Sequence, residues 1–156
     1  MMTDPLNDIE GQIVNLLQGD GGYPTSTITE VLAGNIHEKF RDDLRTYYGH
    51  ELPAIGVMSF GMATDDDGQT VYDVALQVVA MGGTLADLDE DVKTIVAKIV
   101  RLLQKQNEAD GTCLLGTAER ISDINGQIVH GTIETDDDYQ LAVLGEVNCK
   151  VTVYGE

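Results

Sequence analysis

The sequence predicts an α+β protein, with a mainly antiparallel β-sheet and two α-helices packed on one face. Two segments, one near the start and one in the middle, place apolar residues at helical spacing. The stretches between and after them alternate apolar and polar residues and are joined by short segments rich in Asp and Gly, as in antiparallel hairpins. Helices and strands that do not alternate regularly along the chain are typical of the α+β class.

A single domain is expected across residues 1–156. A chain of 156 residues is long enough to bury a substantial core, and no linker or low-complexity segment divides it. No run approaches the ~18 consecutive apolar residues of a membrane span, so no membrane partner is expected. The first 17 residues have no basic region ahead of an apolar one, which favours synthesis in the cytoplasm.

The first predicted helix begins at Pro5, a residue suited to the first helical position, with Asp4 as its cap. The apolar residues of its buried face are Leu6, Ile9, Ile13, Leu16 and Leu17. Glycines in residues 19–24 are expected to end this helix. Residues 25–34 are predicted to form a strand, and residues 35–51 a loop with at most a helical turn.

Residues 52–63 and 70–81 are predicted to form a β-hairpin. The first stretch is apolar on both faces, as in a central strand, and Pro53 stands at its start, where no ladder donor is lost. In the second stretch, apolar residues from Tyr72 to Val78 recur at every other position. This alternation indicates a strand with one face in the core.

A long helix after Thr84 is the strongest local signal in the sequence. Thr84 is a good N-cap, and Asp87 three residues later forms a pair like a capping box. We expect about 22 residues, roughly 33 Å, with acidic residues at the start and basic residues at the end to complement the helix dipole. Its apolar stripe is Leu85, Leu88, Val92, Ile95, Val96, Ile99, Leu102 and Leu103.

The last third of the chain returns to β pattern. Residues 112–124 and 127–135 are predicted to form a hairpin or looser meander around an Asn125–Gly126 turn. Residues 139–156 end in a strand with one buried face, in which Gly145 is expected to mark a bend or bulge.

The tetrapeptide TDDD occurs at residues 64–67 and again at 135–138. Neither copy has the ligand spacing of an EF-hand loop, and adjacent Asp side chains on a strand point to opposite faces. Two copies could hold one ion only if their loops met at one end of the sheet. We interpret both as acidic turns, without a metal or other cofactor. As interaction residues we select Asp65, Asp66, Asp67, Asp136, Asp137 and Asp138.

Other reactive side chains give no catalytic pattern. Cys113 and Cys149 stand in apolar surroundings, and we expect them to be small buried core residues. The three histidines form no metal-binding or catalytic motif, and no serine stands in a nucleophile elbow. Nothing in the sequence indicates an enzyme.

The formal net charge is −18, with only nine Lys and Arg residues. Because binding to a nucleic-acid backbone depends on Lys and Arg, this charge argues against a protein that wraps DNA or RNA. An acidic surface can nevertheless line a passage to which DNA must not adhere.

Four stretches, in this order, carry a resemblance to a known family: ELPAIGVMSFG (51–61), YDVALQVVAMGG (72–83), LADLDEDVKTIVAKIVRLL (85–103) and DYQLAVLGEVNCKVTVY (138–154). With the leading helix, they resemble the tail terminator (tail completion, minor tail protein U-like) proteins of long-tailed bacteriophages and prophages. The resemblance covers nearly the whole chain. The segment 35–51 and the strong acidity have no counterpart in the family pattern.

The resemblance implies a structural protein of the virion that forms a ring, usually of six copies, at the head-proximal end of the tail tube. The ring ends tube polymerisation and offers a surface to the head–tail connector. Its implied partners are other copies of the chain, the tail tube protein and the connector protein. DNA would pass through the lumen without adhering, and we hypothesise that Asp65–Asp67 and Asp136–Asp138 face that lumen.

Three alternatives remain open at the level of sequence. A head–tail joining or neck adaptor protein would have the same general features and would bind a portal complex rather than tube ends. A small metal-dependent cytoplasmic hydrolase could be built on the acidic loops. An acidic DNA-mimic inhibitor would use the charge, although the clean apolar strands do not favour it.

Overall fold

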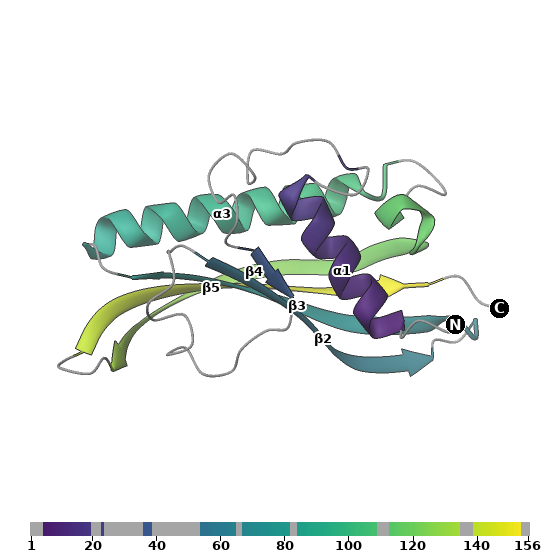
Figure 1. The fold of residues 1–156 in the computed structure, drawn as a ribbon, viewed down its shortest axis with the longest axis horizontal. Coiled ribbons are helices and arrows are strands. Elements are labelled where there is room, and N and C mark those ends of the chain that lie inside the picture. Colours follow the sequence, from purple (N-terminus) through teal and green to yellow (C-terminus); the bar gives the residue numbers. More distant parts are fainter. Residues whose placement is uncertain are drawn as a thin grey trace.

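The computed structural model describes residues 5–19, 23, 36–38, 54–64, 67–81, 84–108, 113–134 and 139–153. Figure 1 shows the elements in chain order: α1 (Pro5–Gln18), β1 (Ile36–Glu38), β2 (Ala54–Thr64), β3 (Thr70–Met81), α3 (Leu85–Lys105), the 3-10 helix η2 (Cys113–Gly116), β4 (Arg120–Glu134) and β5 (Tyr139–Thr152). The strand predicted at 25–34 lies outside the described residues. None of the helices described here is long and apolar enough to cross a membrane.

The sheet has the strand order β1-β2-β3-β5-β4. β1 pairs with β2 in parallel, and the other three pairings are antiparallel. The mainly antiparallel α+β prediction is therefore confirmed. The loop predicted for residues 35–51 is wrong at residues 36–38. These residues form a short strand because they pair with Ile55–Val57. β2 lies inside the sheet between β1 and β3, as predicted for residues 52–63, and β3 is in the middle of the strand order.

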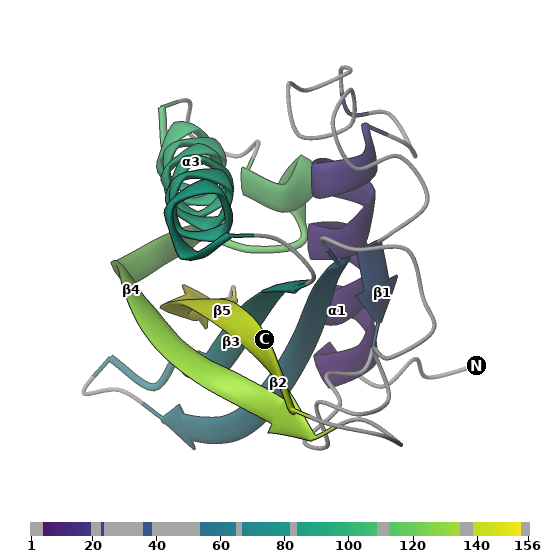
Figure 2. The same cartoon turned by 90° about the vertical axis from the view of Figure 1, so that its left-hand side faces the viewer.

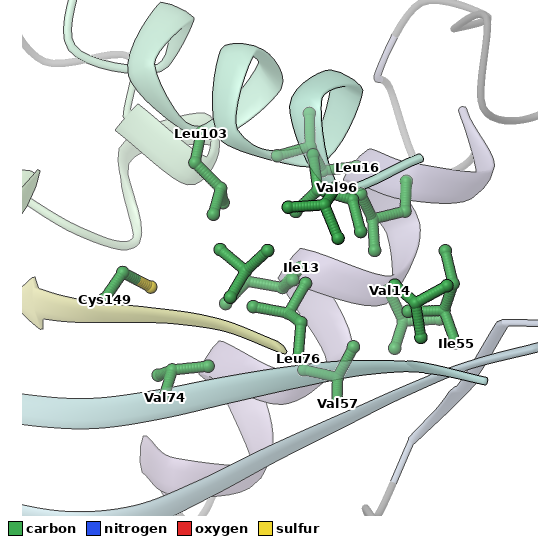
Figure 3. Close-up of a cluster of buried hydrophobic side chains, with 14 of the residues drawn as sticks. Ile13, Val14, Leu16, Ile55, Val57, Val74, Leu76, Val96, Leu103 and Cys149 are labelled. Carbon is green, nitrogen blue, oxygen red and sulfur yellow. The ribbon is translucent and has the colours of Figure 1, made fainter. Parts of the chain in front are cut away.

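Both helices lie on the same face of the sheet, as predicted. α3 runs along the strands and α1 crosses them, and the end-on view shows the sheet curving beneath the two helices (Figures 1 and 2). Cross-strand partners share a face, so Val57, Leu76 and Val147 form one row of the core. Figure 3 shows α1, α3 and the strands meeting there; the side chains it labels are Ile13, Val14, Leu16, Ile55, Val57, Val74, Leu76, Val96, Leu103 and Cys149.

The start of α3 confirms the capping prediction. The Asp87 backbone N–H donates to Thr84 Oγ1 at 3.3 Å, and Thr84 has an extended backbone. Six residues of the predicted stripe are buried: Leu88, Val92, Ile95, Val96, Ile99 and Leu103. Leu85, which the sequence predicts to be part of the stripe, is the first residue of α3 and is exposed.

The predicted Asn125–Gly126 turn is wrong, because β4 continues through it from Arg120 to Glu134. A Cβ on Gly126 would lie 2.7 Å from Val96 Cγ1, so glycine allows α3 to approach the strand. The register shifts just before it, between Ser122 and Asn125. The chain instead reverses between β4 and β5, where Glu134 pairs with Tyr139.

Gly145 is also not a bend or bulge, because β5 keeps a continuous register with β3 on both sides of it. A Cβ there would lie 2.4 Å from Val96 Cγ2 and 2.8 Å from Val92 Cγ1. The glycine therefore makes room for α3. The strand predicted from residue 112 begins only at Arg120, since residues 113–116 form η2.

Candidate functional site

The described residues that flank the two acidic TDDD runs lie at opposite ends of the sheet. The first connects Thr64 to Thr70, at the level where Arg120 of β4 pairs with Thr152 of β5. The second follows Glu134, at the far end of the same β4–β5 ladder. The 14 residues of β5 span roughly 44 Å between these ends, at about 3.4 Å per residue. The described strand ends that flank the two runs are therefore far apart.

Of the six acidic interaction residues selected from the sequence, the structure describes Asp67, which is exposed. Asp65, Asp66 and Asp136–Asp138 lie outside the described residues. Within the described part of the chain, no group of three or more His, Cys, Asp or Glu side chains could hold a metal ion.

A groove runs between α3 and the outer side of β4. Its volume is about 360 Å³. The apolar side chains that line it are Val96, Ala97, Val100 and Ile128. Gly126, which has no side chain, also lines the groove. Lys93, Arg101 and Gln104 form its polar rim. The groove thus combines an apolar floor with two basic side chains.

The basic rim is unusual for such an acidic protein. From Val92 to Asn107 the chain has four basic residues and no acidic one; the basic residues are Lys93, Lys98, Arg101 and Lys105. In the described structure no ion-pair partner lies beside Arg101. β4 has no acidic residue between Asp123 and Glu134. Positive charge therefore gathers on this side of the molecule.

At the start of the groove, Asp89 binds two basic partners. Lys93 Nζ lies 2.7 Å from one Asp89 carboxylate oxygen and His130 Nε2 lies 2.6 Å from the other. The hydrogen bond from Lys93, followed by that from His130, lowers the pKa of Asp89 below its ordinary value. These contacts tie the first half of α3 to β4 and leave Arg101 as the unneutralised cation of the rim.

The end of α3 is fixed to β4 by Asn107. Its Nδ2 donates to the Ile121 carbonyl oxygen at 2.7 Å, and the Ile121 N–H donates to its Oδ1 at 2.9 Å. The amide thus uses both backbone groups that Ile121 would otherwise offer to a neighbouring strand. At Ile121 the outer side of β4 is therefore capped by the Asn107 side chain.

Two segments of the sheet have an unpaired side among the described strands. β4 pairs only with β5, and its 15 residues form one edge. On the opposite edge, β1 covers β2 only at Ile55–Val57, so residues 58–64 have no partner on that side. Each edge carries a register irregularity, between Ser59 and Gly61 and between Ser122 and Asn125. Such bulges discourage indiscriminate pairing with other strands.

A second hollow lies on the sheet face away from the helices, with a volume of about 280 Å³. Its charged lining residues are Asp73, Arg120 and Lys150. Lys150 Nζ lies 3.6 Å from Asp73 Oδ1, and Arg120 Nη1 lies 3.4 Å from Glu119 Oε1, so its cations already face carboxylates. This hollow therefore offers less uncompensated charge than the α3–β4 groove.

Both cysteines are buried and free, as predicted. Burial raises the pKa of Cys113 to about 11 and that of Cys149 to about 12. Because the thiolate is the reactive form, these thiols are poor nucleophiles at neutral pH. Their role is packing in the core.

No protein-family model matches this chain, and no curated protein is similar to it.

The groove residues were not selected from the sequence, which drew attention to the acidic runs. One signal could have found Arg101: the stretch 92–107 is free of acidic residues in a chain of net charge −18. No sequence signal could have found Ile128, because the Asn–Gly pair before it indicated a turn.

Proposed function

We propose that this chain is a structural protein of a phage tail, of the tail-terminator kind. It assembles into a ring of six copies at the head-proximal end of the tail tube, ends tube polymerisation and joins the tail to the head connector. Its role is assembly rather than catalysis.

The observation that carries this proposal is that the sheet has two unlike edge segments with no partner strand among the described residues. Contacts between two different surfaces of identical subunits generate a closed ring when the rotation between neighbours closes. β4 with its groove lies on one side of the sheet, and residues 58–64 of β2 lie on the other. Each copy therefore offers one surface to the copy before it and another to the copy after it.

The charge supports the same role. A ring around passing DNA must not bind it, and a surface with few cations gives phosphates little to pair with. The net charge of −18 fits a lumen through which DNA slides, with the acidic turns Asp65–Asp67 and Asp136–Asp138 as candidate lining. The virion tail is accordingly the proposed location.

Binding to tube ends tests this function. The purified chain is mixed with polymerised tail tubes of a candidate long-tailed phage and imaged by negative stain. The proposal expects a ring on one end of each tube and no further elongation when tube protein is added. Tubes that stay bare and keep growing, while the chain binds an isolated portal complex, would assign it to the neck instead.

A further inference from the structure

We infer that β4 of one copy pairs with β1 of the next copy, so that the sheet continues from subunit to subunit. The added strand lies where the α3–β4 groove leaves space beside β4. This inference rests on the proposed ring and names the two strands that form its contact.

The two strands stand at opposite ends of the described sheet, whose order is β1-β2-β3-β5-β4. They also run in opposite directions, because β1 is parallel to β2 and three antiparallel pairings follow before β4 is reached. A copy placed beside β4 in the same orientation therefore offers β1 as an antiparallel partner. Such a contact joins two different surfaces of the subunit, as a closed ring requires.

The two strands lie at the same height in the sheet. The ladders connect them row by row: one row is Ile36, Ile55, Val78, Gly145 and Ile128, and another is Glu38, Val57, Leu76, Val147 and Gly126. Gly126 and Ile128 both line the α3–β4 groove. At this height a neighbour's β1 therefore meets β4 at the groove.

The hydrogen bonds at the end of β4 show which backbone groups point outward. Asn107 binds both the N–H and the C=O of Ile121, so these groups face away from β5. Val151, opposite Ile121, then turns its own backbone groups toward β3. The Val153 N–H, two residues further on, faces the same way, since it donates to the Thr70 carbonyl oxygen.

This alternation continues along β5, which keeps an unbroken register with β3. Val147 and Gly145 therefore also turn their backbone groups toward β3. Their partners on β4, Gly126 and Ile128, form non-hydrogen-bonded pairs with β5 and direct their N–H and C=O groups outward. The edge of β4 at the groove is thus ready to accept a further strand.

The same alternation sets the outward residues of β1. Across the β3 ladder it turns Ile55 and Val57 of β2 toward β1. In a parallel pair, such residues bond to the two neighbours of their register partner. The register partners themselves, Ile36 and Glu38, therefore direct their backbone groups away from β2.

The outward residues of the two strands match without any shift between copies. Ile36 of one copy comes opposite Ile128 of the next, and Glu38 comes opposite Gly126. Both become hydrogen-bonded pairs, in which each residue donates its N–H to the other's C=O.

Charge favours the same pairing. β1 has one carboxylate residue, Glu38, and no Lys or Arg. The register sets Glu38 opposite Gly126, which lines the groove together with Arg101. Opposite charges on two surfaces steer their association. A symmetric β4–β4 contact would instead bring two basic rims together.

A disulfide at one register position tests this contact. His37 of one copy comes opposite Gln127 of the next in the non-hydrogen-bonded pair, where Cα atoms lie about 4.5 Å apart. Disulfides span about 4.4–6.8 Å between Cα atoms. Within one copy the two residues are four strands apart, roughly 19 Å, so no bond can form inside a subunit.

The double variant His37→Cys, Gln127→Cys is assembled and oxidised with copper–phenanthroline. We expect a ladder of covalent oligomers on a non-reducing gel, which ends at six copies and returns to monomer with dithiothreitol. The matched control is His37→Cys, Val129→Cys, which moves one thiol two residues along the same face of β4. It should give at least about tenfold less cross-linked product, since the Cα atoms are then too far apart.

Two further controls exclude other sources of cross-links. Gln127→Cys alone is expected to stay monomeric on the gel. The wild-type chain should do the same, because Cys113 and Cys149 are buried. Circular dichroism of each variant shows whether the fold is retained.

The outcomes separate this inference from the proposed function. Rings of the double variant that do not cross-link, or that cross-link equally well through residue 129, would overturn the β4–β1 register and leave the ring standing. Covalent dimers of Gln127→Cys alone would overturn it in favour of a symmetric β4–β4 contact. A wild-type chain that stays monomeric in solution and on tube ends would overturn both the contact and the ring.

Discussion

At Gly145 a single missing methyl group determines how closely α3 packs on the sheet. A Cβ there would lie 2.4 Å from Val96 Cγ2, and Val96 is a buried, stiff side chain that cannot move aside freely. The sequence predicts a bend or bulge at Gly145, whereas in the structure the missing side chain makes room for α3. The position of α3, which forms one wall of the groove, is therefore set by its tertiary contact with Gly145 of β5.

Gly145→Ala is expected to lower the free energy of unfolding by about 1–3 kcal/mol, the usual effect of overpacking a core. Urea unfolding measures it. In the double variant Gly145→Ala, Val96→Ala, the nearest clashing methyl group, Val96 Cγ2, is gone, and Val92 Cγ1 is the clashing methyl group that remains. The two changes should then destabilise the protein by less than the sum of their separate effects. Additive effects would show that the close approach does not limit packing.

Asp89 provides a residue-scale test of the contact between α3 and β4. Its pKa is lowered mainly by the hydrogen bond from Lys93 and secondarily by that from His130. Lys93→Met should therefore raise the pKa of Asp89 more than His130→Gln does, as followed by NMR of the carboxyl carbon. The opposite order would show that His130 is the main partner.

The direction of this pKa shift also fixes its effect on stability. A carboxyl group whose pKa is lower in the folded state stabilises the fold above its ordinary pKa of about 3.9. That contribution is lost as the pH falls through the lower, folded-state value. Asp89→Asn should accordingly reduce stability at pH 7 and make little difference in strong acid.

At the scale of elements, local patterns predicted α1, β2, β3, α3 and β5, because each carries its own periodicity and most of them a clear start or end signal. The same patterns failed at β4, where Asn125–Gly126 has the composition of a hairpin turn. Contact with α3 overrides that local preference, since Gly126 is needed for the close approach of Val96. The candidate groove could not be predicted for the same reason: it exists only once β4 is one strand.

Asn107 is the element-scale link between α3 and β4. Asn107→Ala should cost about 1–3 kcal/mol, because it leaves both the N–H and the C=O of Ile121 without their partner. Asn107→Asp keeps the acceptor and loses the donor, so an intermediate loss is expected. Both are measured by urea unfolding.

The control is Asn125→Ala, at an exposed residue whose Nδ2 donates only to the nearby Asp123 carbonyl oxygen. It should have a much smaller effect. If Asn107→Ala proved as mild as this control, the clamp would contribute little to the attachment of α3.

At the scale of the whole molecule, the distribution of charge decides how copies can meet. The net charge of −18 opposes association, yet the acid-free half of α3 gathers four of the nine basic residues. The exposed Asp67 lies between β2 and β3, whereas β4 is the edge strand on the other side of the sheet. Opposite charges at two different places on one subunit favour a directional, head-to-tail contact over a symmetric dimer.

The most direct test of the ring is the native mass of the chain, measured by light scattering with and without Mg²⁺ and then in the presence of tail tubes. Divalent ions should promote assembly by screening repulsion between acidic copies. The account predicts a species with the mass of six 16.9 kDa chains and an open centre in negative-stain images. A monomer under every condition, including on tube ends, would contradict it.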